Sequence, residues 1–97
     1  MTLHAGDNPF LAYPGQRERL EKAMKGTDET IAQFERNPKL LQSNPKLLES
    51  SYTGAASMAC MLGDGAKAAR YYAKITEAKN RESVARTCEQ AHATLQR

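Results

Sequence analysis

The sequence predicts a small all-α protein, an antiparallel bundle of about four helices in one domain. Hydrophobic residues make up 40% of the 97 residues and charged residues 26%, which is typical of a folded domain. The chain has two Phe, four Tyr and no Trp, so Leu, Ala, Met and Ile must fill much of the core, and this suits closely packed helices. No run of β-branched residues alternates with polar ones, so no sheet is expected.

The N-terminal segment, residues 1–14, is rich in Gly, Asp, Asn and Pro and is expected to form an extended arm. The rest of the chain, 15–97, is expected to be a single α-helical domain. The arm carries three apolar side chains that should dock on this domain: Phe10, Leu11 and Tyr13.

A first helix is predicted over about residues 15–36, because apolar or small residues recur there at steps of three and four. Gly26 interrupts this pattern without shifting its phase, so one continuous helix is expected. A break at Gly26 is the alternative, since a central glycine costs roughly 1 kcal/mol relative to alanine.

The segment NPKLLQSNPKLLES, residues 37–50, contains nearly the same seven residues twice. In each copy Asn is a suitable N-cap and Pro suits the first helical position, while Pro disfavours helix in the preceding residue. We therefore expect a corner, with a short helix over 38–43 and a second start at Asn44 and Pro45 that opens a helix over about 45–62. Four leucines should pack in this corner: Leu40, Leu41, Leu47 and Leu48.

Two shorter helices complete the expected bundle. Gly63 can adopt the left-handed conformation that ends a helix, and Asp64 can cap the next one, predicted over about 65–76. Asn80 is expected to cap a last helix over about 81–95. Its apolar face should consist of Val84, Cys88, Ala91 and Leu95.

Residues 49–76 resemble a tetratricopeptide repeat. The run MACMLGDGAKAARYYAKI is similar to the middle of that motif, where a small residue precedes a Leu-Gly-Asp-type turn and an Ala-x3-Tyr second helix. The family's 34-residue period brings no second copy into register, so the resemblance implies one repeat-like hairpin with a closing helix. The structural positions of the motif are matched by Tyr52, Ala56, Gly63, Ala68 and Tyr72.

The resemblance implies a non-enzymatic protein-protein interaction module, either an adaptor or a self-association domain. Residues 65–97 hold seven Lys or Arg and three Asp or Glu, so an acidic peptide or surface is the expected partner chemistry. No nucleic-acid-binding module is recognisable, and nucleic acid is not expected as a partner. The residues predicted to bind the partner are Arg70, Tyr71, Lys74 and Arg81.

Cys60 and Cys88 are the only cysteines, and two interpretations stay open. They are either buried free thiols that act as small hydrophobes, or a disulfide between two parallel helices. The repeat register argues against the disulfide, because it places Cys60 about 9 Å further along its helix than Cys88. Helical tails of bacterial cell-envelope proteins look similar, which implies an alternative function as a structural or capping domain of a larger envelope protein.

No group of residues predicts catalysis, a metal site or a cofactor. His92 follows Cys88 by four residues, but no acid or amide is placed to orient it, and the Cys and His spacings are not those of a metal site. The chain contains no signal-peptide pattern and no run of 18 apolar residues, so a cytoplasmic protein is expected if Met1 is the native start. The periplasm or cell envelope is the alternative for a fragment of an exported protein.

Overall fold

Helices make up all the regular structure of the residues that the computed structural model describes, 8–93 and 95. The prediction of a small all-α bundle is therefore confirmed. The elements are the 3₁₀ turn η1 (Pro9–Leu11) and the α-helices α2 (Gln16–Arg36), α3 (Pro38–Ser43), α4 (Pro45–Met61), α5 (Gly65–Tyr72) and α6 (Ala78–Gln90).

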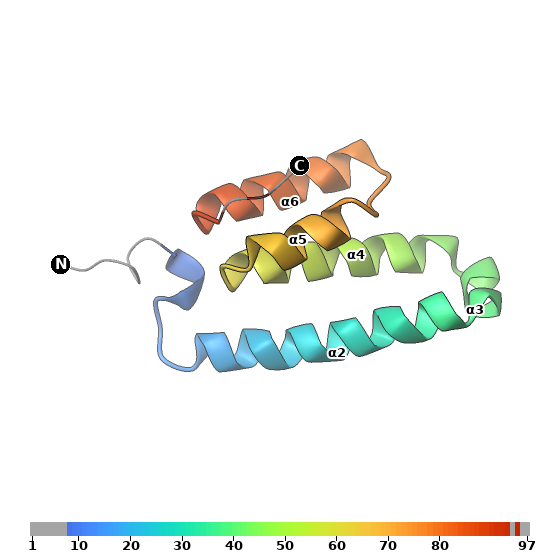
Figure 1. The fold of residues 1–97 in the computed structure, drawn as a ribbon, viewed down its shortest axis with the longest axis horizontal. Coiled ribbons are helices and arrows are strands. Elements are labelled where there is room, and N and C mark those ends of the chain that lie inside the picture. Colours follow the sequence, from blue (N-terminus) through green and yellow to red (C-terminus); the bar gives the residue numbers. More distant parts are fainter. Residues whose placement is uncertain (1–7, 94, 96–97) are drawn as a thin grey trace.

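Helix α4 is the centre of the bundle, and α2, α5 and α6 all pack against it (Figure 1). Four small side chains on its inward face are fully buried. Small side chains allow neighbouring helices to approach closely, so α4 can contact three helices at once. These small residues of α4 are Ala55, Ala56, Ala59 and Cys60.

Helix α2 runs without a break through Gly26 (Figure 1). Met24 and Ile31, on either side of this glycine, are 4% and 2% exposed and belong to the core. The continuous apolar face therefore holds the helix together despite the low helix propensity of glycine.

Replacing Gly26 with alanine should raise the free energy of unfolding by about 0.5–1 kcal/mol, as measured by urea denaturation. A Cβ at this exposed position would meet no atom within 4 Å. Gly63→Ala is the control, because Gly63 has a φ of +82° that alanine adopts only with strain, and this variant should be less stable by about 1 kcal/mol. Equal or lower stability of Gly26→Ala would contradict this account.

The doubled segment forms the predicted corner, but its residues act differently from what was expected. Asn44 starts α4 through its backbone carbonyl, which accepts from the Leu47 N–H at 3.1 Å, and its side chain makes no capping bond. Leu40 and Leu47 do not pack in the corner and are 45% and 40% exposed. Leu48 is half-buried against the core, so one leucine of the second copy carries the packing.

Helices α5 and α6 differ from their predicted bounds. Helix α5 ends at Tyr72 instead of about residue 76, and α6 begins at Ala78 instead of residue 81, with Asn80 inside it. The reason is a carboxylate from α4: Glu49 accepts the N–H of Thr76 and of Glu77 at 3.1 and 3.0 Å. These bonds hold the two residues that directly precede α6, and the helix therefore starts before Asn80.

Helix α6 also ends earlier than predicted, at Gln90 instead of about residue 95. His92 takes a left-handed φ of 56°, and the Ala93 N–H donates to the Cys88 carbonyl at 2.9 Å. This is a Schellman ending, which stops the helix and satisfies one of its last carbonyls.

The N-terminal arm touches the domain near the end of α4. The Asn8 side-chain amide donates to the Met61 carbonyl at 3.0 Å, and Phe10 and Leu11 are half-buried. Tyr13 is 70% exposed, so the expectation that it docks on the domain is wrong. The part of the expected arm before residue 8 lies outside the described residues.

Candidate functional site

An open groove of about 360 Å³ lies between α2 and α5. Ile31 and Ala32 contribute apolar surface to it from α2. The other side chains are acidic on the α2 wall and basic or aromatic on the α5 wall, and we call this site the α2–α5 groove. These side chains are Asp28, Glu35, Lys67, Arg70, Tyr71 and Lys74.

Two ion pairs cross the α2–α5 groove at the same spacing. Lys67 Nζ lies 2.5 Å from Asp28 Oδ2, and Lys74 Nζ lies 3.0 Å from Glu35 Oε2. The two acids are seven residues apart on α2, on one helix face about two turns apart. The two lysines have the same separation in sequence, with Lys67 on α5 and Lys74 in the turn directly after it. The matched spacing allows both pairs to form together.

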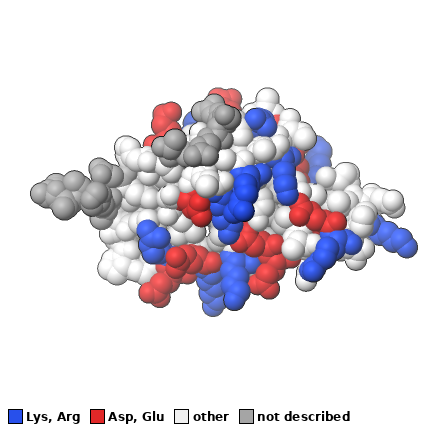
Figure 2. Space-filling model, viewed as in Figure 1, with Lys and Arg blue, Asp and Glu red and all other residues white. Residues whose placement is uncertain are grey.

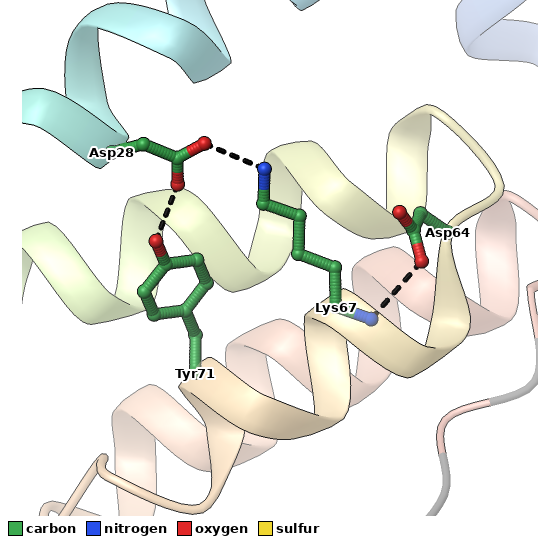
Figure 3. A network of polar contacts seen from close by, with 4 residues as sticks. All are labelled: Asp28, Asp64, Lys67 and Tyr71. Carbon is green, nitrogen blue, oxygen red and sulfur yellow. Dashed lines mark hydrogen bonds and ion pairs between the residues drawn. The ribbon is translucent and has the colours of Figure 1, made fainter.

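A tyrosine hydroxyl donates to each of the two carboxylates. Tyr71 donates to Asp28 (Figure 3), and Tyr52 donates to Glu35 at 2.5 Å. The two tyrosine rings are 6.1 Å apart and tilted by 31°, which is a favourable aromatic arrangement. The acidic wall is therefore hydrogen-bonded to two neighbouring tyrosines, of which Tyr71 lines the groove.

The charge states of these groups follow from their surroundings. Burial raises the pKa of Tyr71 to about 12, and the hydrogen bond to the Asp28 carboxylate adds to this effect. Burial and the Glu35 carboxylate also raise the pKa of Tyr52, and the Tyr52 hydroxyl in turn lowers the pKa of Glu35. At neutral pH the tyrosines are thus neutral donors and Glu35 is charged.

Three of the four predicted partner-binding residues meet in the α2–α5 groove: Arg70, Tyr71 and Lys74. Arg81 does not lie there. Its guanidinium donates to the Tyr72 and Ile75 carbonyls at 3.3 and 2.9 Å and stacks 4.1 Å from the centre of the Tyr72 ring. Arg81 therefore holds the turn between α5 and α6.

The acidic wall of the groove was missed by sequence reasoning. Asp28 and Glu35 repeat at the same seven-residue interval as Lys67 and Lys74, and this match of opposite charges was the available signal. It could not be used without knowing that α2 and α5 lie side by side.

The hairpin residues that resemble a repeat form part of the core. Tyr52 and Tyr72 are 8% and 7% exposed, Ala56 and Ala68 are fully buried, and Gly63 has the left-handed φ of a helix ending. Any close pair of antiparallel helices packs in this way, so the packing does not by itself identify a repeat. Asp64 caps α5 by accepting from the Lys67 N–H at 3.0 Å (Figure 3).

Cys60 and Cys88 form a disulfide that joins α4 to α6, with their Cα atoms 4.8 Å apart. Of the two alternatives, the structure thus contains the disulfide, and both residues are buried. The 9 Å offset expected from the repeat register is absent, because α6 is placed along α4 by its own contacts and not by that register. A Cys88–His92 nucleophile pair is also excluded, since Cys88 has no free thiol.

Glu49 makes its hydrogen bonds at the N-terminal end of α6. Its carboxylate also accepts from the Thr76 hydroxyl at 3.0 Å and from the Asn80 side-chain amide at 3.2 Å. Partial burial alone would raise the pKa of Glu49, but its hydrogen bonds outweigh this and lower it to about 2. Glu49 is therefore charged at neutral pH.

Within residues 8–93 and 95, no cluster of three or more His, Cys, Asp or Glu side chains could bind a metal ion. In the same part of the chain, no helix combines the length and the apolar character needed to cross a membrane.

No protein-family model matches the chain, and no curated protein or solved structure matches it either. The fold and the site define its class as a small all-α helical bundle with one disulfide and an open polar groove between two helices.

Proposed function

We propose that this domain is a non-enzymatic protein-protein interaction module that binds an acidic segment of a protein partner in the α2–α5 groove. One observation carries the proposal. Helix α5 and the turn that follows it place Lys67, Arg70 and Lys74 along the groove, three to four residues apart and beside Tyr71. The resemblance of residues 49–76 to a tetratricopeptide repeat supports the same function.

Arg70 is the cation in this groove that a ligand can use most directly. The two lysines already face Asp28 and Glu35, whereas no ion pair of Arg70 is found among the described residues, and its side chain is exposed. A guanidinium binds a carboxylate through two parallel hydrogen bonds, so Arg70 can select an acidic side chain or a chain terminus.

A hexapeptide of Asp and Glu with a blocked N-terminus and a free C-terminal carboxylate is a suitable probe. It is titrated into isotope-labelled protein, and binding is followed by NMR. Resonances along the α2–α5 groove should shift, and Arg70→Glu should weaken binding at least about tenfold, because an attractive charge becomes a repulsive one.

The matched control is Arg86→Glu, which makes the same charge change on α6. Arg86 pairs with Glu82 one turn away on its own exposed face and does not line the groove. If both variants lost the same amount of peptide affinity, the binding would depend only on net charge. The α2–α5 groove would then not be the binding site.

A second function, a structural or capping domain of a larger cell-envelope protein, is favoured by the disulfide. Buried disulfides persist in oxidising compartments and are rare in the cytoplasm, so Cys60–Cys88 favours export over the cytoplasmic location expected from the N-terminus. Thiol titration of unfolded protein, purified from its native source with and without reductant, tests this function. Two reactive thiols without reductant would remove its support.

A further inference from the structure

The corner between α2 and α4 exposes apolar side chains at one end of the molecule. We call residues 36–48 the corner tip. Among the described residues only three large apolar side chains are exposed, and two of them, Leu40 and Leu47, belong to this tip. Each is the third residue of its helix and follows an Asn-Pro-Lys start, so the doubled segment presents the same side chain twice.

The corner tip is basic as well as apolar. Residues 36–48 contain Arg36, Lys39 and Lys46 and no Asp or Glu. All three cations are exposed, and no ion pair of theirs is found among the described residues. Each lysine directly precedes an exposed leucine. On the face drawn in Figure 2, the end of the molecule around α3 is white and blue.

We propose that the corner tip docks on an anionic lipid membrane surface. Lysines bind acidic headgroups, while the leucines that follow them enter the boundary between headgroups and acyl chains. A second copy of the chain is a poorer occupant, because pairing two tips would bring six cations together without a carboxylate. Two half-exposed leucines also offer far less than the roughly 800 Å² per partner of a stable protein interface.

The position of the corner tip in the fold supports this contact. Helix α3 lies at one end of the longest axis, beyond the ends of α5 and α6 (Figure 1). The tip can therefore touch a flat surface while the α2–α5 groove stays open, and the contact is independent of the proposed peptide binding.

Flotation with vesicles tests the proposal. The protein should bind vesicles made of equal parts phosphatidylglycerol and phosphatidylcholine, and not vesicles of phosphatidylcholine alone. Leu40→Ser with Leu47→Ser should weaken binding at least about tenfold, since both apolar contacts are lost. Lys39→Gln and Lys46→Gln should each weaken it about fivefold. Tyr13→Ser, which removes the exposed apolar side chain outside the tip, should leave binding unchanged.

Several outcomes would overturn the proposal. Absence of binding to the anionic vesicles, equal binding to both kinds of vesicle, or full binding by the double leucine variant would each do so. Leucine-dependent binding of soluble polyglutamate in place of vesicles would assign the tip to an acidic protein. A dimer in light scattering that the leucine variant loses would assign it to a second copy. If the double leucine variant loses its helical circular dichroism signal, the two lysine variants test the same contact in its place.

Discussion

Replacing Cys60 and Cys88 together with alanine should lower the free energy of unfolding by about 3–4 kcal/mol. The disulfide closes a loop over a sequence separation of 28 residues, and the unfolded chain loses conformational entropy through this closure. Alanine is the suitable replacement, because both positions are buried and a serine hydroxyl would need a hydrogen-bond partner there. Urea denaturation under oxidising conditions measures the loss.

The wild-type protein in excess reductant is the matched control, and it should lose a similar amount of stability without any change of sequence. A loss below about 1 kcal/mol in both experiments would mean that α6 is held by its other contacts. Three such contacts are independent of the sulfur atoms: the buried Val84, the Arg81 guanidinium on Tyr72, and the Glu49 carboxylate at the start of α6.

Most of the fold could be predicted because its helix starts and ends depend on residues that are close together in the sequence. The apolar face of α2 keeps one phase through Gly26, and the helix continues there. Pro38 and Pro45 mark two helix starts, and Gly63 ends α4 in the left-handed conformation. Each of these features depends on residues within one or two helical turns, which is the range over which a sequence pattern is informative.

The errors occur where the deciding partner is far away in the sequence. The sequence predicts that Asn80 caps the last helix, but Glu49 determines the start of α6 from α4, more than 25 residues earlier in the chain. The sequence also leaves the disulfide undecided, because the repeat register offsets Cys60 from Cys88 along their helices, and the structure contains the disulfide. Helix propensity and residue spacing describe only neighbours in the sequence. Contacts between distant segments, such as Glu49 with the start of α6, are seen only once the helices are packed.

The candidate site shows the same limit. Arg70, Tyr71 and Lys74 lie within five residues at the end of α5 and just after it, so this part of the basic wall could be predicted from the sequence, whereas Lys67 was not predicted. Its acidic wall could not, because α2 and α5 are separated by α3 and α4 in the chain. Arg81 is also predicted to bind the partner, but its guanidinium donates to the carbonyls of Tyr72 and Ile75 at and after the end of α5.

Glu49 is also the one residue by which the two halves of the doubled segment differ. The first copy has Gln42 at the equivalent position, in the exposed helix α3. Glu49 has four donors around it, two of which are the backbone N–H groups of Thr76 and Glu77. Its negative charge also lies at the N-terminus of α6, where the helix dipole favours an anion.

Glu49→Gln makes the two copies identical and should lower the free energy of unfolding by about 1–2 kcal/mol at pH 7. The estimate is at the modest end for a charged hydrogen-bond acceptor because the site is partly open to water. The start of α6 should also move toward Asn80, where the sequence alone would place it. Urea denaturation measures the first effect, and hydrogen exchange at residues 78–81 measures the second.

The pH dependence of the stability difference shows whether the charge of Glu49, and not only its size and shape, stabilises the fold. The pKa of Glu49 is about 2 in the folded protein against an ordinary value of 4.5, so the unfolded state takes up its proton first as the pH falls. The stability that the charge contributes is therefore complete above about pH 4.5 and is lost as the pH falls toward 2. The difference between the wild type and Glu49→Gln should shrink over this range.

Gln42→Glu is the reciprocal control, since it places the same carboxylate at the equivalent position of the first copy. Gln42 is exposed on α3, and neither α4 nor α6 has a side-chain hydrogen bond from its N-cap residue that this change would remove. This variant should change stability by less than about 0.5 kcal/mol at any pH. If both variants shifted stability equally, or if the loss in Glu49→Gln stayed constant between pH 7 and 2, the start of α6 would not depend on the Glu49 charge.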